Sequence, residues 1–178
     1  MIILQWFVEN GMVANPQKFQ MIFLGAGEED LSIKIGNFTI QNCNEVKLLG
    51  ITLDSKLNFY PHILNICGNA LSKIKTFRRI RGYLNKRQAD LLFYSFIMSP
   101  FAFCPLVWMF CSRQADSLLN ATHYKALRVT EDNFTSSFDD LLKKSKSVSI
   151  HTKNLKLTLF VRRNCQNWTF LKRENKKL

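Results

Sequence analysis

Acidic residues are scarce in this sequence, and they become scarcer along the chain. The 178 residues include 13 aspartates and glutamates against 25 lysines and arginines, which gives a formal charge of +12. Residues 143–178 contain 11 basic residues and one acidic residue. This gradient favours a polyanionic partner, either nucleic acid or an anionic membrane surface. A solvated tail that keeps the chain in solution is the alternative explanation.

Cysteines are few, odd in number and irregularly spaced. These features argue against a disulfide framework and indicate a reducing compartment. Cys104, Cys111 and His123 lack the close paired spacing that structural zinc sites show. Buried free thiols are the better explanation. The five cysteines are Cys43, Cys67, Cys104, Cys111 and Cys165.

The first residues also lack a secretory signal. The segment MIILQWFVEN, residues 1–10, has no basic start, and its apolar run is too short for a signal peptide. We therefore expect an intracellular protein, in the cytoplasm, the nucleus or both. The four Asn-x-Ser/Thr triplets are then explained by chance, because asparagine is common in this chain.

One long segment without charge is a candidate for membrane insertion. Residues 91–111 contain no charged side chain and are numerous enough to span a bilayer. Pro100 and Pro105 interrupt the run, and each removes a backbone donor, although membrane helices tolerate proline. Two core helices joined near Pro100 explain the run equally well. The sequence leaves both alternatives open at this point.

Alternation and turn residues predict a β-rich beginning, after a short helix at residues 2–11 that Gly11 ends. A short strand is expected at residues 18–25. Residues 31–41 have two alternating runs around Gly36-Asn37, which is hairpin chemistry because both residues accept positive φ. A further strand is expected at residues 45–54, with Gly50 inside it.

Helical spacing dominates after Asp54, so we expect an α+β fold with a mainly helical body. In residues 61–81 the apolar positions recur at helical spacing, and Asn85 is a suitable N-cap for a second helix that runs to Ile97. Ser137 and Asp140 have the spacing of a capping box. Further helices are expected at residues 101–112, 114–130, 136–144 and 152–165.

The order of several landmarks resembles a known family. A pattern W…N.M..N..K..M is formed by Trp6, Asn10, Met12, Asn15, Lys18 and Met21. It is followed by VKLLGITLDSKLNFYPHI (46–63), KIKTFRRIRGYL (73–84), YSFIMSPFAFCPLVWMF (94–110), HYKALRVTEDN (123–133) and SFDDLLKKSKSVSIHTKNLKLT (137–158). Over nearly its whole length the chain resembles the C-terminal part of a reverse transcriptase of the non-LTR, LINE-type, jockey-like retrotransposons.

The resemblance implies a division into three parts. Residues 1–57 would be the end of the polymerase palm, residues 58–131 a helical thumb, and residues 132–178 a helical connector with a basic tail. Lys18 matches the lysine of the fourth palm motif, which is thought to protonate the pyrophosphate leaving group. A surface lysine in a turn is the alternative for Lys18.

Two further sets of residues would hold nucleic acid. The hairpin region 46–54 resembles the primer grip, where Gly50 would let the backbone approach the primer. Its proposed contacts are Lys47, Leu48, Leu49 and Gly50. The helix at 61–81 would lie along a duplex with its cations on phosphates, and a solvated helix face is the alternative. Those cations are Lys73, Lys75, Arg78, Arg79 and Arg81.

The metal-holding aspartates of this family are missing from the sequence. Complete enzymes hold Mg²⁺ with palm aspartates that lie upstream of the matched region. Phe138-Asp139-Asp140 lacks the intervening residue of the aromatic-x-Asp-Asp turn and starts a helix instead. We therefore expect a truncated fragment with no cofactor, no small-molecule substrate and no polymerase activity of its own. Its expected partner is an RNA–DNA or DNA duplex primer–template.

Two other classes of protein remain alternatives. A helical protein-interaction module with a basic tail for solubility would bind no RNA–DNA hybrid at any salt concentration. A membrane protein would insert residues 91–111 and would resist carbonate extraction.

Overall fold

The fold is α+β and consists of two compact units, Met1–Leu57 and Asn58–Leu178. The computed structural model describes residues 2–13, 15–25, 31–35 and 38–160. The division at residue 57 coincides with the boundary expected from the sequence. No third unit separates at residue 132, because Leu141 and Ile150 belong to the same buried core as Ile63 and Phe77.

The N-terminal unit begins with helix α1 (Ile2–Glu9), which Gly11 ends at a φ of 67°. A single 3-10 turn follows, η1 (Pro16–Lys18). The strand expected at residues 18–25 is wrong: among the described residues this segment forms one isolated bridge, between Met21 and Asn42. The Asn42 side chain accepts a hydrogen bond from the Phe23 backbone, so a side chain satisfies a donor that a ladder would otherwise engage.

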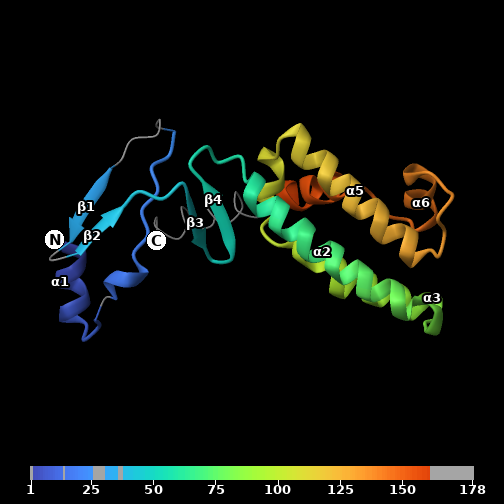
Figure 1. Ribbon diagram of the computed structural model, residues 1–178, viewed down its shortest axis with the longest axis horizontal. Coiled ribbons are helices and arrows are strands. Elements are labelled where there is room, and N and C mark those ends of the chain that lie inside the picture. Colours follow the sequence, from blue (N-terminus) through green and yellow to red (C-terminus); the bar gives the residue numbers. More distant parts are fainter. Residues whose placement is uncertain (1, 14, 26–30, 36–37, 161–178) are drawn as a thin grey trace, which may run out of the picture. The chain divides into compact units, whose positions relative to one another are not determined.

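Two antiparallel hairpins make up the β structure of the described residues, and both are visible in Figure 1. Strands β1 (Ser32–Ile35) and β2 (Phe38–Gln41) form the expected hairpin, whose turn lies outside the described residues. Strands β3 (Glu45–Leu48) and β4 (Ile51–Asp54) form the second. A single strand over 45–54 is therefore wrong. Leu49 and Gly50 have φ angles of 48° and 87°, which reverse the chain in a two-residue turn.

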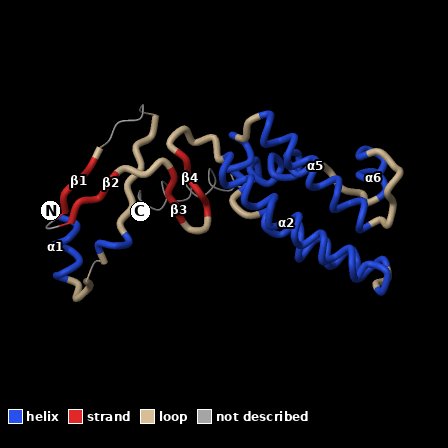
Figure 2. Tube along the Cα trace, viewed as in Figure 1, coloured by secondary structure: helices blue, strands red, loops and turns tan. Residues whose placement is uncertain are grey.

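The regular elements in the described part of the second unit are helices, drawn blue in Figure 2 and joined by tan loops. Its longest helices, α2 (Tyr60–Ile80) and α5 (Arg113–Thr130), pack against each other. Asn85 is the N-cap of α3 (Lys86–Leu92), as the sequence predicts, and it exchanges reciprocal hydrogen bonds with Gln88. Ser137 caps α6 (Phe138–Lys144). A last helical segment covers 150–160, and the rest of the predicted 152–165 helix lies outside the described residues.

The uncharged run 91–111 folds into short pieces of helix rather than one long one. A π-helix, η3 (Phe93–Met98), continues α3 and leads into α4 (Ser99–Ala102), and a 3-10 helix, η4 (Pro105–Phe110), comes next. The α-helix expected at 101–112 is therefore wrong. Pro105 follows Cys104, which has a φ of 47°, so the chain turns there.

Among the residues that the structure describes, no helix has both the length and the apolar content needed to cross a membrane.

The core of the helical unit is built from the apolar faces of these helices. Trp108, Phe93 and Phe101, all from the uncharged run, are almost completely buried. Asn154 donates from its buried side chain to the Phe101 carbonyl at 2.9 Å, which attaches segment 150–160 to α4. The run therefore supplies the interior of the unit, as one of the two sequence alternatives requires.

Candidate nucleic-acid interface

A groove between α2 and α5 collects four cations. Each helix contributes a lysine and an arginine three residues apart: Lys75 and Arg78 from α2, Lys125 and Arg128 from α5. Residues at this spacing share one face of a helix. The groove has a volume of about 650 Å³, and its lining contains no aspartate or glutamate within the described residues. Leu71, Ile74, Val129 and Phe134 complete the lining.

Aromatic rings hold the two guanidinium groups of the groove. Arg78 and Arg128 each lie 5.3 Å from the centre of the Phe134 ring, and Arg128 is also 5.3 Å from the Tyr124 ring. Arg128 donates to the Phe134 carbonyl, while its buried Nε has no hydrogen-bond partner in the described structure. Stacking leaves the in-plane N–H donors of a guanidinium available for phosphate oxygens.

No carboxylate of the described residues forms a salt bridge with these cations. Within the described ranges, Lys86 forms salt bridges with Asp90 and Glu131, and Lys144 forms one with Glu131. None of these salt bridges includes a residue of the groove. Four positive charges beside an apolar floor repel one another, because low-dielectric walls screen them less than water does. An anion that enters the groove relieves this repulsion, so the site has the electrostatics of a phosphate-binding surface.

Lys73, which the sequence predicted to contact phosphate, donates a hydrogen bond to a backbone carbonyl. Pro100 has no N–H, so it cannot donate to the Phe96 carbonyl four residues earlier. The Lys73 ammonium donates to this carbonyl at 3.1 Å and lies 4.8 Å from the Phe96 ring. Lys73 and Lys75 are two residues apart on a helix with 3.6 residues per turn, so they lie on nearly opposite sides. The five cations predicted to contact phosphate therefore do not all share one side of the helix, and their phosphate contacts stay a prediction.

Arg81 also serves the fold. Its Nε donates to the Thr130 carbonyl at 3.0 Å, and another guanidinium nitrogen donates to the Leu84 carbonyl at 3.0 Å. Thr130 ends α5, where helix carbonyls lack intrahelical donors and a cation is favourable. Arg79 remains exposed and outside the groove lining. Of the five predicted cations, the groove receives Lys75 and Arg78.

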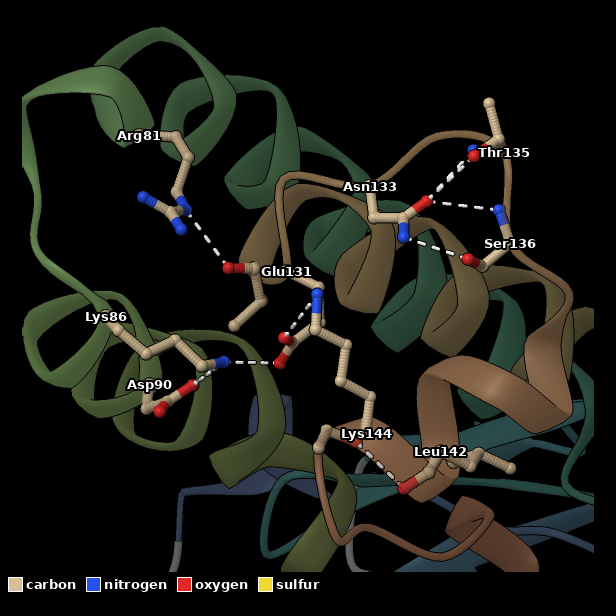
Figure 3. A network of polar contacts seen from close by, with 11 residues as sticks. Arg81, Lys86, Asp90, Glu131, Asn133, Thr135, Ser136, Leu142 and Lys144 are labelled. Carbon is tan, nitrogen blue, oxygen red and sulfur yellow. Dashed lines mark hydrogen bonds and ion pairs between the residues drawn. The ribbon is translucent and has the colours of Figure 1, made fainter.

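A polar cluster holds the helix ends beside Arg81 (Figure 3). The Glu131 carboxylate, whose side chain is 2% exposed, receives hydrogen bonds or ion pairs from Lys86 and Lys144. Burial by itself lowers the pKa of Lys86, but hydrogen bonds to Asp90 and Glu131 raise it above its ordinary value. This cluster ties α3 and α6 to the end of α5.

The hairpin that resembles a primer grip exposes its turn. Leu49 is 86% exposed and Leu48 57% exposed, which is unusual for leucines. Leu49 also has the left-handed backbone conformation, which costs about 1 to 2 kcal/mol for a residue with a Cβ. Lys47 is exposed on the adjoining strand. The turn is apolar, strained and exposed, which is consistent with a contact surface. Its role as a primer grip remains a prediction.

Lys18 lies where the sequence predicts a turn. It is the last residue of η1, its side chain is exposed, and its backbone donates to the Asn15 carbonyl at 3.1 Å. The Asn15 side chain also accepts from the Gln17 backbone, which is a common way for asparagine to make a turn. The proposed role of Lys18 as a general acid stays a prediction.

The acidic pair at the start of α6 has a capping role. Asp139 and Asp140 occupy the first turn, and Ser137 Oγ accepts from the Asp140 backbone at 3.3 Å. Both side chains are exposed, and the negative charge is favourable at a helix N-terminus. This agrees with the sequence interpretation that Phe138-Asp139-Asp140 starts a helix.

Sequence reasoning missed half of the groove, namely Lys125 and Arg128. A usable signal was present, because Lys-x-x-Arg occurs both at 75–78 and at 125–128 within long amphipathic helices. What the sequence alone could not show is that the two pairs face the same space. Phe134, which follows α5 in a loop, gave no signal of its own.

No family model, curated protein or solved structure matches this chain.

Proposed function

We propose that this chain is the primer–template-binding part of a LINE-type reverse transcriptase and holds nucleic acid by its phosphate backbone. The observation that supports this most is the groove with Lys75, Arg78, Lys125 and Arg128 and no acidic residue in its described lining. Lysine and arginine both suit phosphate oxygens, and contacts to phosphate carry no sequence information, so binding through this groove is independent of sequence.

The volume of the groove limits what enters it. A space of about 650 Å³ accommodates a short stretch of one strand and not the cross-section of a duplex. The groove therefore binds the backbone of one strand, while the rest of a duplex stays outside. The resemblance to a polymerase thumb motivates the choice of an RNA–DNA hybrid as the ligand to test first. The sequence supplies no metal-holding aspartates, so binding without nucleotide incorporation is expected.

Fluorescence anisotropy with a labelled RNA–DNA hybrid tests the proposal. The double variant Lys75→Gln/Lys125→Gln removes one cation from each side of the groove. Its control, Lys143→Gln/Lys156→Gln, removes the same charge from exposed positions outside the groove lining. We expect the groove variant to bind at least about tenfold more weakly than the control, because it neutralises fewer phosphates and so releases fewer counterions.

Two outcomes contradict the proposal. If both variants are weakened by the same factor, net charge and not the groove causes binding. If the wild-type chain binds neither an RNA–DNA hybrid nor a DNA duplex at low salt, a helical protein-interaction module becomes the better explanation.

A further inference from the structure

A second group of side chains comes together at the beginning of α5, and it does not depend on nucleic-acid binding. Cys111, Asp116 and His151 each present a possible ligand atom, and the three atoms lie within 4.8 Å of one another. Cys111 follows η4, Asp116 lies in the first turn of α5, and His151 lies in segment 150–160. The trio considered from the sequence, Cys104, Cys111 and His123, shares only one residue with this cluster.

Two polar atoms of the cluster are buried without hydrogen-bond partners in the described structure. Asp116 Oδ1 and His151 Nδ1 both lack a partner in the described structure. Burying such a group unpaired costs about 1 to 3 kcal/mol, so two adjacent ones need an explanation. Asn120 donates from Nδ2 to Asp116 Oδ2 at 3.1 Å, which orients the carboxylate and leaves Oδ1 toward the cluster. A metal ion satisfies both atoms at once.

The geometry points to a divalent metal site of the zinc type, with Cys111, Asp116 and His151 as ligands and water in the fourth position. Zinc accepts sulfur, nitrogen and oxygen ligands together, whereas Mg²⁺ and Ca²⁺ prefer oxygen alone. Tetrahedral bonds of about 2.0 to 2.3 Å place ligand atoms about 3.3 to 3.7 Å apart. The side chains therefore move together by up to about 1 Å, which is within the reach of side-chain rotation.

Metal binding here links distant parts of the helical unit. His151 lies 35 residues after Asp116 in the chain (151 − 116), so the ion closes a long loop. The Cys111 thiol gives up its proton to solvent when it becomes a ligand. The metal–ligand bonds tie segment 150–160 to the start of α5. The hydrogen bond of Asn154 separately attaches the same segment to α4. We therefore expect zinc to stabilise the folded protein, since the unfolded chain does not present these ligands together.

Cobalt titration of the full chain, freed of metal by a chelator, tests the site. Co²⁺ replaces zinc with the same ligands and shows a thiolate charge-transfer band in the near ultraviolet. We expect this band to saturate at one equivalent, to disappear in Cys111→Ser, and to persist in the control variants Cys104→Ser and Cys165→Ser. Asn120→Ala keeps the ligands but removes the orienting bond, so its affinity falls about 10-fold to 100-fold.

Thermal unfolding gives a second measurement that needs no cysteine change. Zinc raises the unfolding midpoint of the wild-type chain and leaves that of His151→Gln unchanged, provided that circular dichroism shows both to be folded. The proposal is overturned if the folded wild-type chain gives no thiolate band, or if the band survives in Cys111→Ser. It is equally overturned if zinc stabilises His151→Gln as much as the wild type.

Discussion

Protonation of the buried His123 provides a quantitative prediction about stability. The imidazole is 1% exposed and stacks on Phe93 at 6.1 Å with an edge contact to Phe138 at 5.6 Å. Neither ring nitrogen has a hydrogen-bond partner in the described structure. Burial, and secondarily the charge of Lys153, lowers the pKa of His123 to about 4 from the ordinary 6.5. The folded protein therefore holds this histidine neutral.

The sign of the effect follows from linkage. Between these two pKa values the unfolded chain binds a proton that the folded protein does not, so stability rises with pH in this window. The contribution is complete above about pH 6.5 and is lost as pH falls toward about 4. The full shift corresponds to about 3 kcal/mol, of which about 2 kcal/mol lies between about pH 7 and pH 5. This is a large part of the roughly 5 to 15 kcal/mol that is typical of a folded domain.

Urea unfolding at about pH 7, 6 and 5, followed by circular dichroism, measures this contribution. The matched variant His123→Leu fills much of the same apolar space and cannot be protonated. When the pH falls from about 7 to about 5, the free energy of unfolding of this variant should decrease by about 2 kcal/mol less than that of the wild type. A residual slope from His62, whose pKa burial also lowers, is expected in both proteins. The same pH dependence in both proteins would refute this description of the His123 environment.

Three other substitutions test separate parts of the structure. Arg81→Ala removes two hydrogen bonds to carbonyls and should lower the free energy of unfolding by about 2 to 4 kcal/mol, whereas the exposed Arg79→Ala should change it by less than about 0.5 kcal/mol. Equal effects in urea unfolding would contradict the capping role of Arg81. Glu131→Ala removes the buried partner of Lys86 and Lys144, which are themselves about half exposed, so it should cost only about 1 kcal/mol in the same assay. Leu49→Asn suits the left-handed turn and should stabilise the N-terminal unit by about 1 kcal/mol, and no change in its unfolding midpoint would argue against strain at this turn.

Local chemistry determined which elements could be predicted from the sequence. Asn85 with Gln88, and Ser137 with Asp140, mark helix beginnings because capping depends on residues a few positions apart. The hairpin at 45–54 could not be predicted in this way, because its turn places Leu49 at a positive φ that leucine rarely adopts. The helix predicted at 101–112 was wrong because the apolar content of this segment disguised the turn at Cys104-Pro105.

The candidate sites depend on contacts between distant residues, which a single sequence does not display. Lys73 and Lys75 look equivalent in the sequence, yet one donates to the Phe96 carbonyl and the other lines the groove. The partner of Lys75 across the groove, Lys125, lies 50 residues away (125 − 75). His151 and Cys111 are likewise far apart in the chain. Helical spacing predicts which residues share a face but not which faces meet.

The salt dependence of binding tests the central claim most directly. Four groove cations on phosphates predict that the logarithm of affinity falls with the logarithm of salt concentration with a slope of at least about −3.6. Between about 50 and 300 mM salt, the affinity of the wild-type chain for an RNA–DNA hybrid should therefore fall by at least about 600-fold. In Lys75→Gln/Lys125→Gln the slope should become about 1.8 less steep. Binding that survives the higher salt unchanged, or a slope that this variant leaves unaltered, would contradict the proposed phosphate groove.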